Sequence, residues 1–370
     1  MSKAVKVNIP WARPFFSKAE QRYVSDAVRS TWVSRGPYAA KFETQINQLL
    51  KSKHGVATSN GTASLYLALL GLSIGRGDEV IVPGLTFVAP ANMVLAVGAK
   101  PVFADIDPLT WCISPQAIEK KITAKTKAII VVHLYGNVCD MKAILAMARK
   151  HRLRVIEDTA EAIFSKYDGK YVGTLGDVGC FSFHAAKTIT TGEGGFITTQ
   201  NAALHAGIER LSDQGRTRGR RYWHDMVGFN FRITDLQAAV GCGQLASLPR
   251  IMAAKKKMHH LYVRHLNNEA GIVLQHILPD AEPLIWVVAI KIDPKVFGCS
   301  RDALMAKLLK AGIETRPGFY PFNAMPFYKA PALPVSAQVG LHVICLPLSV
   351  DLTAQEIQFI CRTLLALRKD

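Results

Sequence analysis

Lys187 has the sequence surroundings that best suit covalent chemistry. It follows the apolar run of residues 180–183 and precedes Thr191-Gly192-Glu193-Gly194-Gly195, so we expect it on a tight connection between two buried strands. A lysine lodged among apolar strands loses hydration, which makes its amine a better nucleophile for forming an imine. The alternative is a surface lysine on a hairpin whose glycines serve only the turn.

Asp158 is a second candidate because it ends a β-branched run, residues 154–156, as Glu157-Asp158. In parallel α/β sheets, ligands gather beyond the carboxyl ends of the strands. A carboxylate at that position could hold a metal, a ribose hydroxyl or a protonated heterocycle. Taken alone, Asp158 is better explained as a helix N-cap, a common role for aspartate between a strand and a helix.

Residues 59–63, Ser-Asn-Gly-Thr-Ala, open a predicted helix. Unpaired amides and the positive end of the helix dipole point to one spot there, so Thr62 and Ala63 form a candidate phosphate cradle. Every helix start has this property, and Ser182 adds a hydroxyl close to Lys187 in the sequence. A phosphate, a ring nitrogen and an aldehyde, one for each of these three signals, are combined in pyridoxal phosphate.

The chain is strongly basic, with 45 Lys and Arg against 28 Asp and Glu and a formal net charge of +17. Such a charge favours polyanionic partners without choosing among a nucleotide, a nucleic acid and a membrane. A dense cationic stretch contains Arg216, Arg218, Arg220 and Arg221. It is either a solvated loop or an anion-binding segment. The sequence has no recognised nucleic-acid-binding motif, and we expect neither nucleic acid nor membrane as a partner.

The 370 residues are 49% hydrophobic and 20% charged, as in ordinary soluble globular enzymes, which excludes a disordered or fibrous chain. At this length we expect one large domain and one smaller domain, residues 1–250 and 251–370. The seven cysteines are odd in number and lack CxxC spacing, which argues against disulfides or a metal site and suits a reducing cytosol. The N-terminus has no signal-peptide pattern.

Short β-branched runs alternate with helical patterns through the middle of the chain. The runs fall at residues 79–82, 101–104, 128–132 and 154–156, and helical patterns lie between them at 91–97, 115–121 and 141–150. This order predicts βαβ units and a mostly parallel sheet. Two further runs, 179–183 and 195–199, flank Lys187. Helical spacing over 17–50 is broken at 33–37, and a long helix through 255–266 belongs to the smaller domain. Residues 80–99 are uncharged, but prolines and glycines interrupt them, so we expect a strand, a loop and a core helix there instead of a membrane span.

The whole chain resembles a known family, the DegT/DnrJ/EryC1/StrS sugar aminotransferases. The matching stretches, in collinear order, are Trp32-Val33-Ser34-Arg35-Gly36-Pro37-Tyr38, Ser59-Asn60-Gly61-Thr62-Ala63-Ser64, Gly77-Asp78-Glu79-Val80-Ile81-Val82-Pro83, Val155-Ile156-Glu157-Asp158 and Gly228-Phe229-Asn230-Phe231-Arg232. The resemblance implies an α/β enzyme of the fold-type I, pyridoxal phosphate-dependent class. Its large domain would contain a mostly parallel sheet, and a smaller α/β domain would follow at the C-terminus.

The same resemblance implies roles for the candidate residues. Lys187 carries pyridoxal phosphate covalently and moves a proton between substrate and cofactor. Asp158 faces the pyridine nitrogen and keeps it protonated, so that the ring draws off the electrons released when a C–H bond breaks. Thr62, Ala63 and Ser182 hold the phosphate.

Three further cofactor contacts follow from the resemblance. Phe87 stacks on the ring, with a core phenylalanine as the alternative because its surroundings are apolar. Glu161 lies on the same face as Asp158 if a helix starts there, and it orients the ring. Asn230 reaches the phosphate from the neighbouring subunit, which implies a homodimer with two shared sites.

Within the family, the chain looks closest to members that act on a GDP-linked sugar. The segments that carry this likeness are Lys187-Thr188-Ile189-Thr190-Thr191-Gly192-Glu193-Gly194-Gly195, Tyr222-Trp223-His224-Asp225 and Glu314-Thr315-Arg316-Pro317, followed by Tyr320-Pro321 and Met325-Pro326. The implied reaction moves an amino group from glutamate to GDP-4-keto-6-deoxy-mannose in the cytoplasm, in the biosynthesis of lipopolysaccharide O-antigen. Candidate substrate residues are Trp32, Ser34, His184, Arg220, Arg316 and Tyr320.

Other functions stay open at this point. His184-Ala185-Ala186 stands where close relatives have Phe-Gly-Asn, so a UDP- or dTDP-linked keto sugar is an alternative acceptor. A pyridoxal phosphate-dependent sugar dehydratase is a second alternative, but its relatives have histidine in place of Lys187. A non-catalytic regulator or nucleic-acid-binding protein on the same fold is suggested by the net charge alone.

Overall fold

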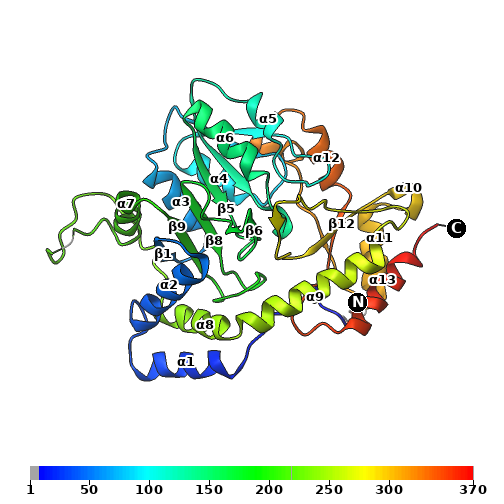
Figure 1. The fold of residues 1–370 in the computed structure, drawn as a ribbon, viewed down its shortest axis with the longest axis horizontal. Helices are drawn as coiled ribbons and strands as arrows, with labels where there is room; N and C mark the ends of the chain where they lie inside the picture. The colour runs from blue at the N-terminus through cyan, green and yellow to red at the C-terminus, as the bar shows by residue number, and fades with distance from the viewer. Residues whose placement is uncertain (1–7, 218, 370) are drawn as a thin grey trace.

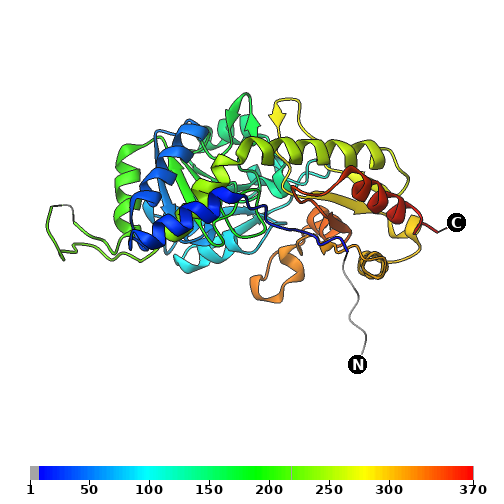
Figure 2. The same cartoon turned by 90° about the horizontal axis from the view of Figure 1, so that it is seen from below.

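A computed structural model of the chain describes residues 8–217 and 219–369. Its body is built around a seven-stranded sheet, and a long helix, α9 (Leu248–Leu266), runs from the body to the C-terminal helices (Figure 1). The loop between α7 (Ala202–Ser212) and α8 (Asp235–Ala246) projects from the body in both Figure 1 and Figure 2.

The central sheet has the strand order β1-β9-β8-β5-β4-β2-β3. Its strands are β1 (His54–Thr58), β2 (Glu79–Pro83), β3 (Lys100–Ala104), β4 (Thr126–Val132), β5 (Arg154–Asp158), β8 (Val178–Ser182) and β9 (Gly195–Thr199). The strands from β8 to β3 pair in parallel, and β9 is antiparallel to both of its neighbours. The predicted mostly parallel sheet is therefore confirmed, and each predicted run coincides with one of these strands, except that Phe183 lies just beyond β8.

Helices connect the successive parallel strands from β2 to β5, whereas the described residues between β5 and β8 contain no helix. The helices of this part are α1 (Lys18–Arg29), α2 (Pro37–Leu50), α3 (Gly61–Gly71), α4 (Ala89–Ala96), α5 (Pro115–Glu119) and α6 (Met141–His151). Side-chain caps fix where several of them begin. Ser17 and Glu20 form a capping box at α1, and Asp140 accepts the Ala143 N–H at the start of α6. The predicted break at residues 33–37 separates α1 from α2.

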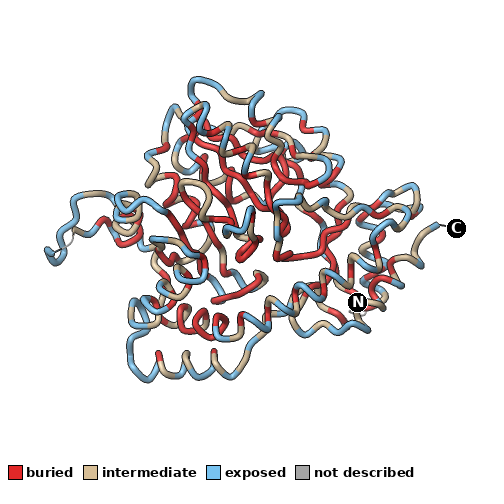
Figure 3. The backbone as a smooth tube through the Cα atoms, viewed as in Figure 1, coloured by how far each residue is buried: buried red, intermediate tan, exposed pale blue. Residues whose placement is uncertain are grey.

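The sheet is the most deeply buried part of the molecule (Figure 3). Ile129, Ile130 and Val131 of β4 are fully buried, because a parallel strand is covered on both faces. Residues 80–99 form β2, a loop and α4, as predicted. None of the helices in the described part of the chain combines the length and the apolar character needed to span a bilayer.

Packing by α2 fixes the two strands that flank Lys187. Phe42 of α2 meets Phe183 and Phe196 edge-on, with ring centroids 5.2 and 6.4 Å away. All three rings are fully buried. The ends of β8 and β9 are therefore anchored against a helix, which holds the connection between them in place.

The chain beyond α8 builds a second, antiparallel sheet with the order β10-β12-β14-β13. Its elements are β10 (Ile272–Leu274), β12 (Val288–Ile292), α10 (Pro294–Phe297), α11 (Arg301–Lys310), β13 (Arg316–Pro317), α12 (Pro334–Gly340), β14 (Val343–Leu346) and α13 (Ala354–Leu365). A separate core includes Tyr262, Leu304 and Ile360, together with Ile9 of the N-terminal arm. Helix α9 begins at Leu248, before the predicted residue 255, and the domain boundary at residue 250 stays a prediction.

Candidate active site

The candidate site lies at the carboxyl edge of the central sheet. Asp158 is the last residue of β5, and Ser182 is the last residue of the adjacent strand β8. Parallel strands end at one edge of a sheet, so both side chains lie at that edge. Thr58, at the end of β1, belongs to the same edge because β1 and β8 are both antiparallel to β9. The turn that leads into α3 is therefore also at this edge.

Lys187 lies on the connection between β8 and β9, as predicted. Its side chain is 13% exposed, and its amine lies 3.4 Å from Glu161 Oε1. The amine also lies 3.7 Å from the centroid of the Trp286 ring. The loop is closed by hydrogen bonds, because the Phe183 N–H donates to Gly194 O at 2.8 Å. The alternative of a surface lysine on a hairpin is therefore wrong.

No helix starts after Asp158, because residues 160–164 form turns, so the condition under which Glu161 would share a helix face with Asp158 is not met. The residue still reaches the site. Its carboxylate is buried, Oε2 accepts the Tyr135 N–H at 2.7 Å, and Oε1 faces the Lys187 amine. Burial raises the pKa of Glu161, while the neighbouring Lys187 ammonium acts in the opposite direction. In this structure Glu161 is thus a partner of Lys187.

Asp158 is buried and has one carboxylate oxygen available for a ligand. Oδ1 accepts the Ala160 N–H at 3.0 Å, in a local turn that begins no helix, so the N-cap explanation is wrong. Within the described residues, no hydrogen-bond donor meets Oδ2. Burial raises the pKa of Asp158, and the Ala160 N–H and the Lys187 charge counteract that rise. A cationic ring N–H next to Oδ2 would favour the ionised carboxylate in the same way.

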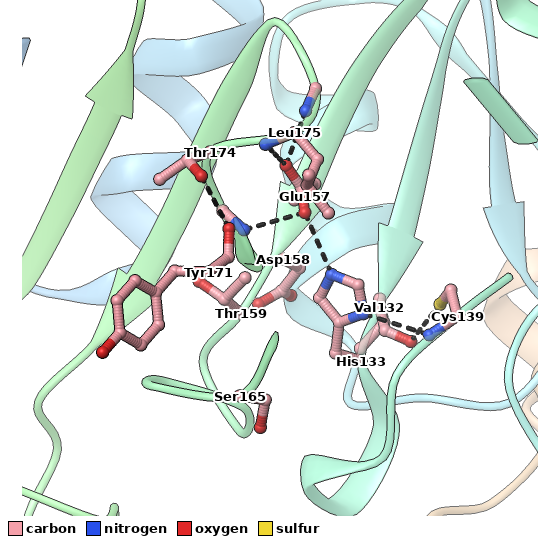
Figure 4. A network of polar contacts seen from close by, with 12 residues as sticks. Val132, His133, Cys139, Glu157, Asp158, Thr159, Ser165, Tyr171, Thr174 and Leu175 are labelled. Atoms are coloured by element: carbon pink, nitrogen blue, oxygen red, sulfur yellow. Dashed lines mark hydrogen bonds and ion pairs between the residues drawn. The ribbon is translucent and has the colours of Figure 1, made fainter. Parts of the chain in front are cut away.

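A buried polar network lies next to Asp158 (Figure 4). Its centre is the fully buried carboxylate of Glu157, which accepts the backbone N–H groups of Gly173 at 2.8 Å, Leu175 at 2.8 Å and Gly176 at 2.6 Å. His133 Nε2 lies 3.2 Å from Glu157 Oε2. Because the Cys139 N–H donates to His133 Nδ1, Nε2 carries the proton and donates to Glu157. The backbone N–H of His133 donates to Asp158 O at 3.2 Å, which connects the network to the end of β5.

The turn into α3 has the form of an anion cradle. A Cβ on Gly61 would lie 2.8 Å from Ser182 Cβ, so glycine allows the helix end to approach β8 this closely. This close approach places the first turn of α3, which includes Thr62, beside Ser182. Ala63 differs from the expectation: its N–H donates to Asn60 Oδ1 at 2.8 Å and is already paired.

Phe87 is 54% exposed, so its alternative as a core phenylalanine is wrong. Its ring centroid lies 5.9 Å from that of Phe319, whose ring stacks on Tyr135 at 5.5 Å. Tyr135 in turn holds Glu161 through its N–H. An accessible aromatic face is therefore connected by direct contacts to the surroundings of Lys187.

Asn230 is exposed and lies close to the cradle within the same chain, because the Ser59 N–H donates to Phe231 O at 2.8 Å. Its Oδ1 accepts from Arg232 Nε and Nη2 at 3.2 and 3.1 Å. Arg232 Nη1 lies 2.8 Å from Asp213 Oδ1. With Oδ1 engaged, the amide NH2 is the group that Asn230 can offer to an anion. A contact from a neighbouring subunit stays a prediction.

Three of the candidate substrate residues lie close to the Lys187 surroundings. His184 is on the same loop and is half-exposed, with Nε2 3.7 Å from Glu193 Oε1. Arg316 lies with Cζ 5.8 Å from the Trp11 ring centroid, and Trp11 meets Trp286 edge-on at 5.9 Å. Tyr320 is 46% exposed and directly follows Phe319 in the chain.

The other three candidates lie elsewhere. Trp32 is 60% exposed in the break between α1 and α2, and Ser34 O accepts the Asp235 N–H. Arg220 stacks on Trp223 at 3.6 Å in the projecting loop. No contact joins Trp32, Ser34 or Arg220 to Lys187 within the described part of the chain. Arg218 lies outside the described residues.

Three buried residues of the site are not found from the sequence: Tyr135, Lys255 and Trp286. Trp286 stands in an apolar stretch that is typical of a core strand, and Lys255 stands in a run of three lysines that is typical of a solvated helix face. Tyr135 has φ 60 and ψ 10, a left-handed conformation that non-glycine residues adopt uncommonly. None of the three has a local motif that predicts its position.

These groups fit the parts of pyridoxal phosphate. The Lys187 amine suits an aldehyde, Asp158 Oδ2 suits a protonated ring nitrogen, and the Gly61 cradle with Ser182 suits a phosphate. Phe87 offers an aromatic face. Among the described residues, no group of three or more His, Cys, Asp or Glu could hold a metal ion. The amine, the carboxylate and the start of α3 together suit an organic, phosphate-bearing cofactor.

Comparison with known proteins agrees with this chemistry. The model of the DegT/DnrJ/EryC1/StrS aminotransferase family matches residues 15–365. GDP-perosamine synthase of Escherichia coli O157:H7 is 40% identical over 359 residues, covering 96% of this chain and 97% of that protein. GDP-perosamine synthase of Vibrio cholerae is also 40% identical, covering 95% of this chain and 97% of its own length. Among solved structures, the PLP form of Spr1654 from Streptococcus pneumoniae has a TM-score of 0.92 and 29% identity, and covers 97% of this chain and 98% of that one.

Proposed function

The chain belongs to the DegT/DnrJ/EryC1/StrS aminotransferase family, and on that premise we propose that it moves the amino group of glutamate to GDP-4-keto-6-deoxy-mannose, giving GDP-perosamine. Two relatives of that activity, each 40% identical over nearly the whole chain, support this acceptor. The observation that carries the proposal is the position of the Lys187 amine, 3.4 Å from Glu161 and at the same sheet edge as Asp158.

Pyridoxal phosphate, the cofactor of this enzyme class, supplies an aldehyde that links to amines and a ring that accepts an electron pair. We assign its binding to residues of this site. Lys187 would provide the amine for attachment, and Asp158 Oδ2 would pair with the ring nitrogen and keep it protonated. Thr62 and Ser182 would bind the phosphate at the N-terminal end of α3. Phe87 covers a face of the ring.

Lys187 also moves the proton of the reaction. When it is not attached to the cofactor, Lys187 Nζ would be free to take a proton from the substrate carbon and to return it one position away. Glu161 holds that amine from one side. Because the same Nζ both attaches the cofactor and carries the proton, replacement of Lys187 by alanine removes both steps.

We further propose a homodimer with shared sites. Asn230, an exposed residue of the loop between α7 and α8, would reach the phosphate bound in the neighbouring subunit. The loop carries Arg216, Arg220 and Arg221, and Tyr222 on it is 75% exposed. Such a cationic and aromatic extension suits the diphosphate and base of a nucleotide sugar. The seven cysteines are unpaired, which suits a reducing cytoplasm as the site of the reaction.

The acceptor is tested by incubating the purified protein with glutamate and, separately, GDP-, UDP- and dTDP-linked 4-keto-6-deoxy sugars. The product is read by mass spectrometry. We expect replacement of the keto oxygen by an amino group on the GDP sugar alone. Amination of a UDP or dTDP sugar alone overturns the acceptor but not the enzyme class. Loss of a hydroxyl without gain of nitrogen would indicate a dehydratase.

The shared site is tested by co-expressing two inactive subunits, Lys187→Ala and Asn230→Ala. If Asn230 serves the partner's site, the mixed dimer contains one intact site and transaminates, whereas neither variant does so alone. If Asn230 serves its own subunit, mixing restores nothing. The matched control pairs Lys187→Ala with Asp158→Ala, two residues that one subunit supplies to the same site, so each site of the mixed dimer lacks one of them and mixing should restore no activity.

A further inference from the structure

We propose that Trp286 is a positioning residue for Lys187: its ring face and the Glu161 carboxylate form a cradle that holds the amine while it is not attached to the cofactor. The contact itself is independent of the substrate, and its catalytic meaning rests on the proposed function. Trp286 comes from the segment just before β12, 99 residues after Lys187 in the sequence. Their contact is created entirely by the fold.

The geometry is that of a cation held from two sides. Lys187 Nζ lies 3.7 Å from the Trp286 ring centroid and 3.4 Å from Glu161 Oε1. The side chains are shielded from water: Trp286 is 7% exposed, Glu161 is 5% exposed and the Lys187 side chain is 13% exposed. A cation over an indole face gains more when it is desolvated, and indole is the best of the aromatic rings for this contact. The amine therefore has one preferred place.

Trp286 is fixed in turn by four contacts, two of its ring and two of its backbone. Its Nε1–H donates to Ala186 O at 2.6 Å, so the ring is bonded to the very loop that carries Lys187. Its backbone N–H donates to Tyr135 O at 3.0 Å, and its backbone oxygen accepts from Lys255 Nζ at 3.1 Å. Trp11 packs edge-on at 5.9 Å. These contacts fix the position of the ring against which the lysine amine lies.

Tyr135 connects the two halves of the cradle. Its N–H donates to Glu161 Oε2, and its carbonyl accepts from Trp286, so one peptide segment sets the position of both groups around the amine. Tyr135 adopts φ 60 and ψ 10 to do so. A non-glycine residue in the left-handed region is kept only where the surrounding structure requires it, and such residues cluster at functional sites. The strained backbone of Tyr135 is therefore maintained by its hydrogen bonds with Glu161 and Trp286.

The cradle addresses a specific problem of the reaction. A lysine freed from the cofactor has four rotatable side-chain bonds, and its amine loses the position from which it moves the proton. Restricting that amine to one place preserves the orientation that proton transfer needs. Trp286 acts through Lys187 and is not itself a proton donor or acceptor.

The test measures how strongly the free Lys187 amine is held. Holoenzyme is incubated with glutamate, so that Lys187 is free, and is briefly treated with acetic anhydride at fixed pH. Acetylation of Lys187 is then counted by mass spectrometry relative to exposed Lys120. Tryptophan analogues with one to four ring fluorines are placed at position 286 alone. Fluorine weakens the attraction of the ring for a cation while hardly changing its size.

We expect Lys187 acetylation to rise stepwise with fluorination, by about fivefold or more for the most fluorinated ring. Trp286→Leu should show the full rise, and Trp286→Phe, which keeps an aromatic face, a smaller one. The matched control is the same fluorinated series at Trp11, which packs on Trp286 without contacting Lys187 and should leave acetylation unchanged. Equal acetylation across the series at position 286 overturns the proposal.

Two measurements keep a failure interpretable. Thermal unfolding of each fluorinated protein shows whether the fold is kept, and only folded variants are compared. The same series is also labelled on apoenzyme, where Lys187 is free without any transamination. A stepwise rise in apoenzyme with no release of Lys187 by glutamate supports the cradle and contradicts the proposed function. Equal Lys187 acetylation across the fluorinated series in apoenzyme contradicts the Trp286–Glu161 cradle, whether or not glutamate releases Lys187 from the cofactor.

Discussion

Glu157 and Asp158 are consecutive residues of β5, yet their carboxylates have opposite environments. Both oxygens of Glu157 are engaged, by three backbone N–H groups and by His133. Asp158 uses one oxygen for the Ala160 N–H and keeps the other for a ligand. Successive side chains of a strand point to opposite faces of the sheet, so the two carboxylates serve different purposes. Glu157 stabilises the strand end, and Asp158 has an oxygen available for the proposed contact with the cofactor.

Replacement of Glu157 tests this division. Glu157→Leu should lower the free energy of unfolding by about 3–5 kcal/mol, because it leaves several buried donors without an acceptor. Glu157→Gln keeps one acceptor oxygen and should cost about 1–3 kcal/mol. The control is Glu119→Gln, which removes an exposed ion pair with Lys150 and should change stability by less than about 0.5 kcal/mol. Urea denaturation measures all three, and equal effects of Glu157→Gln and Glu119→Gln would contradict the assignment.

Replacement of Asp158 should act on catalysis. Asp158→Ala leaves the ring nitrogen without a negative partner, so kcat/KM for transamination should fall by at least ~100-fold, about 3 kcal/mol of transition-state stabilisation. Attachment of the cofactor to Lys187 should persist, and borohydride reduction followed by mass spectrometry of the Lys187 peptide checks it. Near wild-type transamination by Asp158→Ala would show that the assignment of Asp158 is wrong.

The phosphate cradle depends on the absence of a side chain at Gly61. In Gly61→Ala the new Cβ would meet Ser182 Cβ at 2.8 Å and Phe181 O at 3.2 Å, so the end of α3 must move away from Ser182. We expect the dissociation constant of pyridoxal phosphate to rise about tenfold, about 1.4 kcal/mol, in a fluorescence titration. The control is Gly207→Ala in α7, where an added Cβ meets nothing within 4 Å. An unchanged dissociation constant in Gly61→Ala would remove the cradle from the binding site.

Much of this architecture is predictable because local patterns determine it. The β-branched runs give β2, β4 and β5, and the glycines after Lys187 give the tight connection between β8 and β9. The position of Asp158 follows from the rule that parallel strands end at one edge. These features depend on neighbours in the sequence, which a reader of the sequence can see.

The remaining features depend on contacts between distant segments. Trp286 stands in an apolar stretch that is typical of a core strand, and only the fold brings its ring to Lys187. Glu161 would share a face with Asp158 only on a helix, but the chain after Asp158 turns, and the Tyr135 N–H holds the Glu161 carboxylate instead. Phe87 stands in an apolar stretch, yet it lies on a loop at the sheet edge and is exposed. Periodicity contains no information on such tertiary partners.

Lys255 gives a prediction for stability against pH. It is buried on α9, and burial lowers its pKa from 10.5 to about 8. Below pH 8 the lysine is protonated in both the folded and the unfolded protein, and the folded state bears the full cost of a buried charge, about 3 kcal/mol for a shift of this size. Between pH 8 and 10.5 the unfolded state binds more protons than the folded state, so this cost disappears as the pH rises.

Lys255→Met keeps the packing of the side chain but removes the charge and the hydrogen bond to Trp286 O. At pH 7 the variant should be more stable than the wild type by about 2 kcal/mol, because relief of about 3 kcal/mol outweighs the loss of a hydrogen bond of about 1 kcal/mol. At pH 10.5 the order should reverse by about 1 kcal/mol, since the neutral lysine still donates its hydrogen bond. Urea denaturation at several pH values measures the crossing, with Lys256→Met on the exposed face of the same helix as the control that should show none. A stability difference between Lys255→Met and the wild type that stays constant from pH 7 to 10.5 would show that Lys255 has an ordinary affinity for its proton, and that burial at this position imposes no electrostatic cost on the residue supporting Trp286.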